Sequence, residues 1–169
     1  MRTLSLLVLT LLCQVAFSQS IEELDKRNGF KDIQVNTSVL DYAGLEFDKD
    51  DEHPYYQLIK VYKAKKGEYE SIGSIKIYDL KVLTYRDSVF RIVVTTEKNP
   101  DLYKALKSTF GEPEYHLRNK FHHWTGKNLR LSYIPVGKDK LELTYESFLM
   151  KDKLKEDEEE EIEEIMSDF

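Results

Sequence analysis

The sequence contains a single cysteine, and this scarcity excludes several kinds of chemistry together. Cys13 lies in an apolar stretch near the start of the 169-residue chain, and no other thiol follows it. Residues 14–169 therefore offer no disulfide, no cysteine-ligated zinc site and no thiolate nucleophile. The folded part of the chain must be stabilised by its hydrophobic core.

Motifs that carry catalysis or metal binding are also missing. No serine stands in a Gly-x-Ser-x-Gly turn, and there is no glycine-rich phosphate loop. His122 and His123 are adjacent, so on a strand they point to opposite faces and do not chelate one ion together. The acidic run 48–52 lacks the glycine and the glutamate of a calcium loop, because His53 and Ile59 occupy those places. We expect a non-enzymatic protein with no cofactor and no metal site.

An excess of basic charge is absent as well. The chain has a net charge of −6, of which residues 1–20 carry one arginine and residues 151–169 carry three lysines and ten acids. Residues 21–150 are therefore neutral, with 21 basic and 21 acidic side chains. A nucleic-acid-binding domain needs a net basic face, so we exclude nucleic acid as a partner.

Residues 1–20 have the layout of an export signal. Arg2 gives a positive start, residues 4–12 form an apolar stretch, and residues 16–18 form a small-x-small cleavage site. The apolar stretch is shorter than the roughly 20 residues that span a bilayer. We predict a cleaved signal peptide, no transmembrane segment in the mature chain, and a location in the periplasm, in the cell envelope or outside the cell.

Residues 21–150 are predicted to form a single α+β domain with an antiparallel sheet. Their number is large enough for one hydrophobic core. Runs rich in Val, Ile, Tyr and Thr predict strands at 30–35, 58–63, 80–86, 89–96, 121–125, 129–134 and 141–145. A capping-box pattern at 20–23 predicts a short helix, and a further helical turn is expected at 38–44. The charged segment 46–54 is predicted to be a surface loop.

The main helix is predicted over residues 100–110. Asn99 is a good N-cap, Pro100 fits the first helical position, and Gly111 ends the helix. Apolar residues recur on one side of this segment, which predicts that the helix packs on one face of the sheet.

Residues 151–169 form an acidic C-terminal tail of different composition. Six consecutive acids follow three lysines, an order that opposes the helix dipole and places like charges close together. A small apolar stripe nevertheless recurs at helical spacing. We predict a solvated, marginal and frayed helix that orders against a partner.

Five residues are candidates for partner binding, and they favour a domain that binds another envelope or secreted protein. They are Trp124, Ile162, Ile165, Met166 and Phe169. Two alternatives remain. A carboxylate-dependent hydrolase of envelope polymers would need a deep cleft with two carboxylates. A carbohydrate-binding module would need Trp124 exposed and coplanar with two tyrosines.

Two stretches carry a resemblance to known proteins. Residues 28–33, Asn-Gly-Phe-Lys-Asp-Ile, and residues 106–133, with Phe-Gly-Glu-Pro, Trp-Thr-Gly and Leu-Arg-Leu-Ser-Tyr, resemble small exported domains of unknown function of the Bacteroidota type. More distantly, a helix followed by Gly-x-Pro and a Trp-containing strand is similar to BamE and β-lactamase-inhibitor-protein-like envelope domains. The shared motifs are structural, so the resemblance implies an exported α+β domain and assigns no functional residue.

Overall fold

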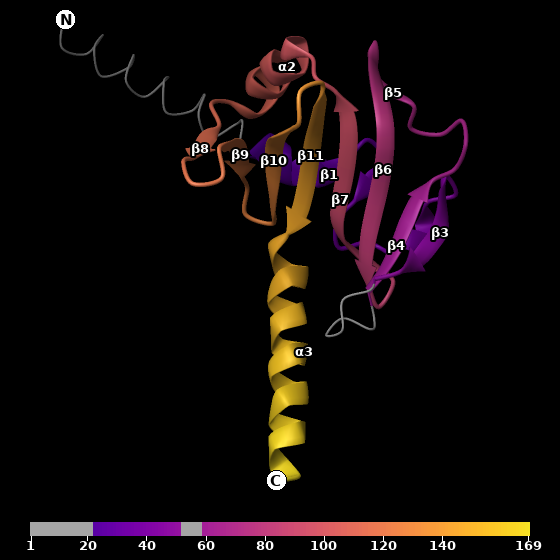
Figure 1. Ribbon diagram of the computed structural model, residues 1–169, viewed down its shortest axis with the longest axis vertical. Helices are drawn as coiled ribbons and strands as arrows, with labels where there is room; N and C mark the ends of the chain where they lie inside the picture. Colours follow the sequence, from indigo (N-terminus) through magenta and orange to yellow (C-terminus); the bar gives the residue numbers. More distant parts are fainter. Residues whose placement is uncertain (1–21, 52–58) are drawn as a thin grey trace, which may run out of the picture.

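The computed structural model describes residues 22–51 and 59–169 (Figure 1). The predicted signal peptide lies outside these residues. The described chain is an α+β structure built on one large antiparallel sheet, as predicted. A helix lies at one end of the sheet, and a longer C-terminal helix extends from the opposite end (Figure 1).

The large sheet has nine strands in the described residues, in the order β3-β4-β6-β7-β11-β10-β9-β8, with β5 beside β6. All of its pairings are antiparallel. The strands are β3 Leu45–Asp50, β4 Ile59–Ala64, β5 Ser71–Ile72, β6 Ile75–Tyr85, β7 Ser88–Glu97, β8 Glu114–His116, β9 Phe121–Thr125, β10 Leu129–Val136 and β11 Lys140–Ser147. A separate hairpin is formed by β1 Gly29–Phe30 and β2 Ile33–Gln34.

The two faces of the sheet differ in how far their side chains are buried. On β11, Leu141, Leu143 and Tyr145 are buried and alternate with half-buried polar residues. Strands whose side chains alternate in this way bury one face and leave the other wet. The face that carries Leu141 and Leu143 is called the covered face here, and the side that carries Glu142 and Glu146 is called the open face.

Helix α2, Pro100–Phe110, packs on the covered face with the bounds that the sequence predicts. The Asn99 side chain accepts a hydrogen bond from the Asp101 amide, and Pro100 occupies the first turn. Three buried side chains, Leu102, Leu106 and Phe110, join the main hydrophobic core. The helix therefore derives its position from its apolar side, while its caps set its length.

The N-terminal segment covers another part of the same face. Residues 22–27 are helical, and a 3-10 turn follows at Val39–Asp41. The Asp25 carboxylate accepts hydrogen bonds from the Lys127 and Asn128 amides at 2.8 and 2.9 Å. A Cβ on Gly126 would lie 2.5 Å from Asp25 Oδ1, so any larger residue there would push the Asp25 carboxylate out of this position. These contacts tie the N-terminal helix to the loop between β9 and β10.

Several predicted elements differ in detail from the structure. Residues 46–54 were expected to form a loop, but 45–50 form strand β3, and 52–58 lie outside the described residues. The segment 30–35 is a tight hairpin rather than one strand, because the chain reverses at Lys31, which has φ 55°. Strands β5 and β8 are too short for a periodicity to reveal them. The turn between β6 and β7 falls at Arg86 and Asp87, between the strands predicted at 80–86 and 89–96.

The C-terminal helix differs most from expectation. Helix α3 runs without interruption over Phe148–Ser167, so it is longer than α2, and the boundary predicted at residue 150 falls inside it. Ser147 is fully buried, and its hydroxyl accepts a hydrogen bond from the Met150 amide at 3.2 Å. A buried N-cap thus starts the helix directly where β11 ends.

Candidate binding sites

The five residues predicted to bind a partner lie in two separate places. Trp124 is only 4% exposed, and its indole Nε1 donates a hydrogen bond to the Gly111 carbonyl oxygen at 2.8 Å. It holds the C-terminal end of α2 against β9. Its ring is tilted by 51° to that of Tyr103. A buried ring with a tilted neighbour gives no flat platform on which a sugar could stack, and it offers no surface to a protein.

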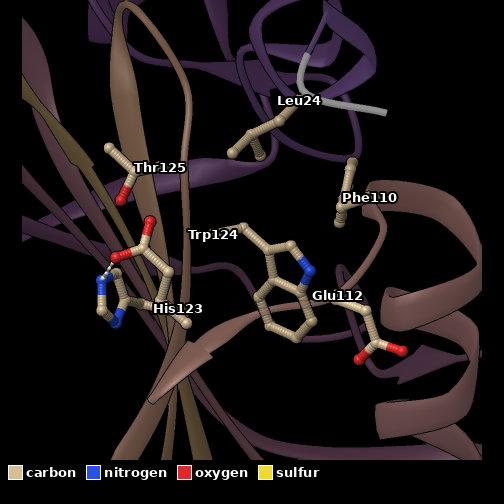
Figure 2. Close-up of a pocket in the computed structure, with 7 residues that line it drawn as sticks. Leu24, Phe110, Glu112, His123, Trp124 and Thr125 are labelled. Carbon is tan, nitrogen blue, oxygen red and sulfur yellow. Dashed lines mark ion pairs between the residues drawn. The ribbon is translucent and has the colours of Figure 1, made fainter. Parts of the chain in front are cut away.

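A small pocket of about 60 Å³ lies beside Trp124 at the edge of the sheet (Figure 2). It is lined by Leu24, Phe110, Glu112, Glu114, His123, Trp124 and Thr125. Glu114 Oε2 lies 3.5 Å from His123 Nε2, and Glu112 Oε1 pairs with Lys107 Nζ at 2.5 Å. Sites for small-molecule ligands usually measure about 300–1,000 Å³. The pocket is too small for a sugar unit of a polymer and does not support the hydrolase alternative.

The environment of the His123 imidazole on β9 lowers its pKa. Burial lowers its pKa, the Glu114 carboxylate opposes that effect, and Arg130 and His116 reinforce it. Desolvation disfavours the charged form of a base, so His123 favours its neutral form in the folded protein. Its Nδ1 is buried and has no hydrogen-bond partner in the part of the chain that the structure describes.

The other histidines of this edge do not combine into a metal site. His122 lies on the face opposite to His123, where its ring packs 5.1 Å from Tyr103 and 4.9 Å from Tyr115. His116 stacks on Phe121, with ring centres 5.0 Å apart. Within residues 22–51 and 59–169, no group of three or more histidine, cysteine or acidic side chains is arranged to hold a metal ion.

The first turns of α3 are attached to the open face. Met150 is buried with Ile59, Tyr85 and Phe90 in a second, smaller core, and Leu154 packs against it. One turn further, Asp157 accepts a hydrogen bond from the Tyr85 hydroxyl and pairs with Arg86 at 3.1 Å. The acidic tail, predicted to be a solvated and marginal helix, is therefore held to the sheet as far as residue 157.

Beyond residue 157 the helix extends away from the sheet (Figure 1). Four apolar side chains are exposed there: Ile162 by 48%, Ile165 by 54%, Met166 by 68% and Phe169 by 105%. Ile162, Ile165 and Met166 lie on α3, and Phe169 follows the C-cap Asp168 and continues the same helical spacing. These four residues are called the distal stripe. They are the part of the predicted site that the structure brings together on one surface.

Two larger hollows were not predicted from the sequence. One, of about 320 Å³, lies between α3 and the open face, where Arg91 and Glu146 form an ion pair at 2.5 Å. The other, of about 400 Å³, lies between α2, the β1–β2 hairpin and β11 on the covered face. It is called the α2 groove here. Its lining residues are Arg27, Gly29, Phe30, Lys31, Gln34, Ile72, Leu102, Ala105, Leu106, Thr109, Phe110, Leu143 and Tyr145.

Neither hollow has a signal in the sequence. The apolar residues of α2 have the spacing of an ordinary core-facing helix. The groove exists because the hairpin at residues 29–34 and the helix stand on the same face of the sheet with a gap between them.

Comparisons with known proteins identify no protein similar to this chain. No family model, no curated protein and no solved structure matches this chain. No helix among the described residues is both long enough and apolar enough to cross a membrane. The functional argument therefore rests on the surfaces described above.

Proposed function

We propose that this protein is an exported, non-enzymatic binding domain that captures another envelope or secreted protein through the distal stripe. The observation that carries the proposal is the stripe itself, which places three exposed apolar side chains on a helix that extends away from the sheet and a fourth, Phe169, directly after the C-cap of that helix. Apolar residues at positions i, i+3, i+4 and i+7 are the anchors of helices that bind in a hydrophobic groove of a partner.

The acidic charge around the distal stripe indicates what kind of partner surface would bind it. Residues 151–169 carry ten acids and three lysines, and the acids dominate the part that surrounds the distal stripe. A complementary surface is an apolar groove with lysine or arginine side chains along its rim. Such rim charges speed the encounter and are weakened by salt, whereas the apolar anchors hold the complex.

The position of the stripe on α3 also supports binding rather than core packing. In an α-helix successive residues are about 100° apart around the axis. By that measure the centre of the stripe is roughly a quarter turn from the centre of the side formed by Met150, Leu154 and Asp157, which contacts the sheet, and Ile165 lies nearly in line with Leu154. The four side chains of the stripe are exposed beyond the last of these contacts, so a partner can reach them.

Export rests on the sequence of residues 1–20, and mass spectrometry of envelope material tests it directly. We expect a mature protein that begins near Gln19 or Ile21 and carries no lipid. A species that starts at an acylated Cys13 would contradict this expectation.

The partner proposal is tested by capture from the native envelope with matched variants. Ile165→Gln removes one anchor, whereas Glu164→Gln introduces the same side chain beside the stripe. We expect Ile165→Gln to weaken capture strongly and Glu164→Gln to leave it nearly unchanged. Deletion of residues 159–169 should abolish capture without changing the thermal unfolding of the domain, because the contacts that anchor α3 end at Asp157. Capture that survives the deletion would place the partner surface elsewhere.

A further inference from the structure

The α2 groove combines an apolar interior with positive charge. Its apolar walls come from α2 through Leu102, Leu106 and Phe110, and from Leu143 on β11. Of the side chains that line it, Arg27 and Lys31 are charged, and no carboxylate is among them. Its volume of about 400 Å³ falls in the range of sites for small ligands.

The two cations are held close to aromatic walls of the groove. The Arg27 guanidinium lies 5.9 Å from the centre of the Phe110 ring, and the Lys31 ammonium lies 5.8 Å from that of Phe30. Arg27 also pairs with Glu23 at 2.8 Å, which offsets part of its charge. No ion pair of Lys31 occurs within the described residues, so its charge is available to an anion.

Tyr145 adds a hydrogen-bond donor inside the groove. The residue is 4% exposed and lines the groove, and its hydroxyl has no hydrogen-bond partner among the described residues. Burial raises the pKa of Tyr145, and the nearby Arg27 opposes only part of this shift, so the hydroxyl keeps its proton. Because Tyr145 lines the groove, its hydroxyl is placed to donate a hydrogen bond to an acceptor bound there.

The lining also indicates what kind of molecule fills the apolar part. A peptide would bring an amide group at every residue, and each buried amide needs a partner. The uncharged polar side chains of the lining are Gln34, Thr109 and Tyr145, and the Thr109 hydroxyl already donates to the Ala105 carbonyl oxygen at 2.8 Å. An alkyl chain has no polar groups, so it needs no hydrogen-bond partners inside the groove.

We propose that the α2 groove binds a free fatty acid. The alkyl chain lies against Leu102, Leu106 and Leu143. The carboxylate faces Arg27 and Lys31 and accepts a hydrogen bond from the Tyr145 hydroxyl. This site is separate from the distal stripe and does not depend on the function proposed for it.

Calorimetric titration of the full chain with laurate tests the proposal, with lauryl alcohol as the uncharged control. We expect one laurate per chain and about tenfold weaker binding of the alcohol, because a carboxylate gains charge-assisted contacts that the alcohol lacks. Equal affinity for the two ligands, or no binding of laurate, would overturn the proposal.

Three variants locate the site. Ala105 is exposed on α2 and lines the groove, so Ala105→Phe should block laurate, while Ser108→Phe on the same helix, outside the lining, should leave binding unchanged. Tyr145→Phe removes only the hydroxyl and should weaken laurate binding about tenfold. Thermal unfolding of each variant checks its fold. Undiminished binding by folded Ala105→Phe would refute the assignment. Deletion of residues 159–169 should not affect laurate, so this test and the capture experiment fail independently.

Discussion

The covered and open faces of the sheet show two ways of attaching a helix. On the covered face, α2 lies along the core and buries three side chains, and Trp124 fixes its last turn. On the open face, among the described residues, the contacts of α3 with the sheet come from its first three turns, through Met150, Leu154 and Asp157. The first arrangement stabilises the domain. The second leaves about half of a 20-residue helix available for contact with another molecule.

The largest difference between the faces is expected for Leu106→Ala on the covered face. Replacing a buried leucine by alanine costs about 2–5 kcal/mol, because transfer energy is lost and a cavity remains. Urea unfolding should show a loss of this size, whereas Lys104→Ala, on the exposed side of α2, should change the free energy of unfolding by no more than about 0.5 kcal/mol. Equal effects of the two variants would mean that α2 does not support the core.

On the open face, Leu154→Ala should cost less, about 1.5 kcal/mol, because the side chain is only half-buried. Leu149→Ala is the matched control, since Leu149 is 65% exposed at the start of the same helix. Hydrogen exchange should show that Leu154→Ala loosens α3 while α2 keeps its protection. Loss of protection in both helices would make α3 part of the same cooperative unit.

The polar attachment of α3 is tested by Tyr85→Phe, which removes the hydroxyl that donates to Asp157 and keeps the ring in its core. A hydrogen bond of this kind contributes about 1 kcal/mol net, so a loss near that value is expected in urea unfolding. Tyr78→Phe serves as control, because Tyr78 is 47% exposed and lies outside the core that holds Tyr85. If the two variants behave alike, apolar contacts alone hold the first turns of α3.

The smallest expected effect concerns pH and the His123 side chain on β9. Because the folded protein lowers the pKa of His123 below 6.5, the unfolded chain binds a proton that the folded chain excludes between those two values. The free energy of unfolding should therefore fall as the pH decreases from 6.5 toward the lowered pKa. His123→Gln should flatten this dependence in denaturant titrations, and His116→Gln, which removes one of the groups that lower the pKa of His123, should weaken it less. An unchanged slope in His123→Gln would assign the dependence to other groups.

The sequence predicts best where local chemistry decides the structure. The bounds of α2 follow from Asn99, Pro100 and Gly111, which act through neighbouring backbone groups. Strand β11 could be predicted because one of its faces is buried, which imposes alternation. Strand β3 could not, because five of its six residues are exposed and no alternation results.

The sites follow a similar division. The distal stripe has a helical spacing that is visible in the sequence, and the structure places three of its residues on α3 and Phe169 directly after the C-cap Asp168. The burial of Trp124 depends on Gly111 and on the packing of α2, which pattern alone does not reveal. The contact between Tyr85 and Asp157 joins residues 72 positions apart. The α2 groove depends on the distance between α2 and the β1–β2 hairpin, and the sequence of neither element indicates it.

Strand β3 also determines how the molecule behaves among copies of itself. It is the last strand on its side of the sheet, where backbone groups could pair with another chain. Its sequence places Glu46, Asp48, Lys49 and Asp50 on this rim, and the register shifts between Phe47 and Lys49. Charges and a bulge on an outer strand discourage a second sheet from joining edge to edge. The charged segment that the sequence predicts to be a loop is thus an edge strand whose charges oppose aggregation.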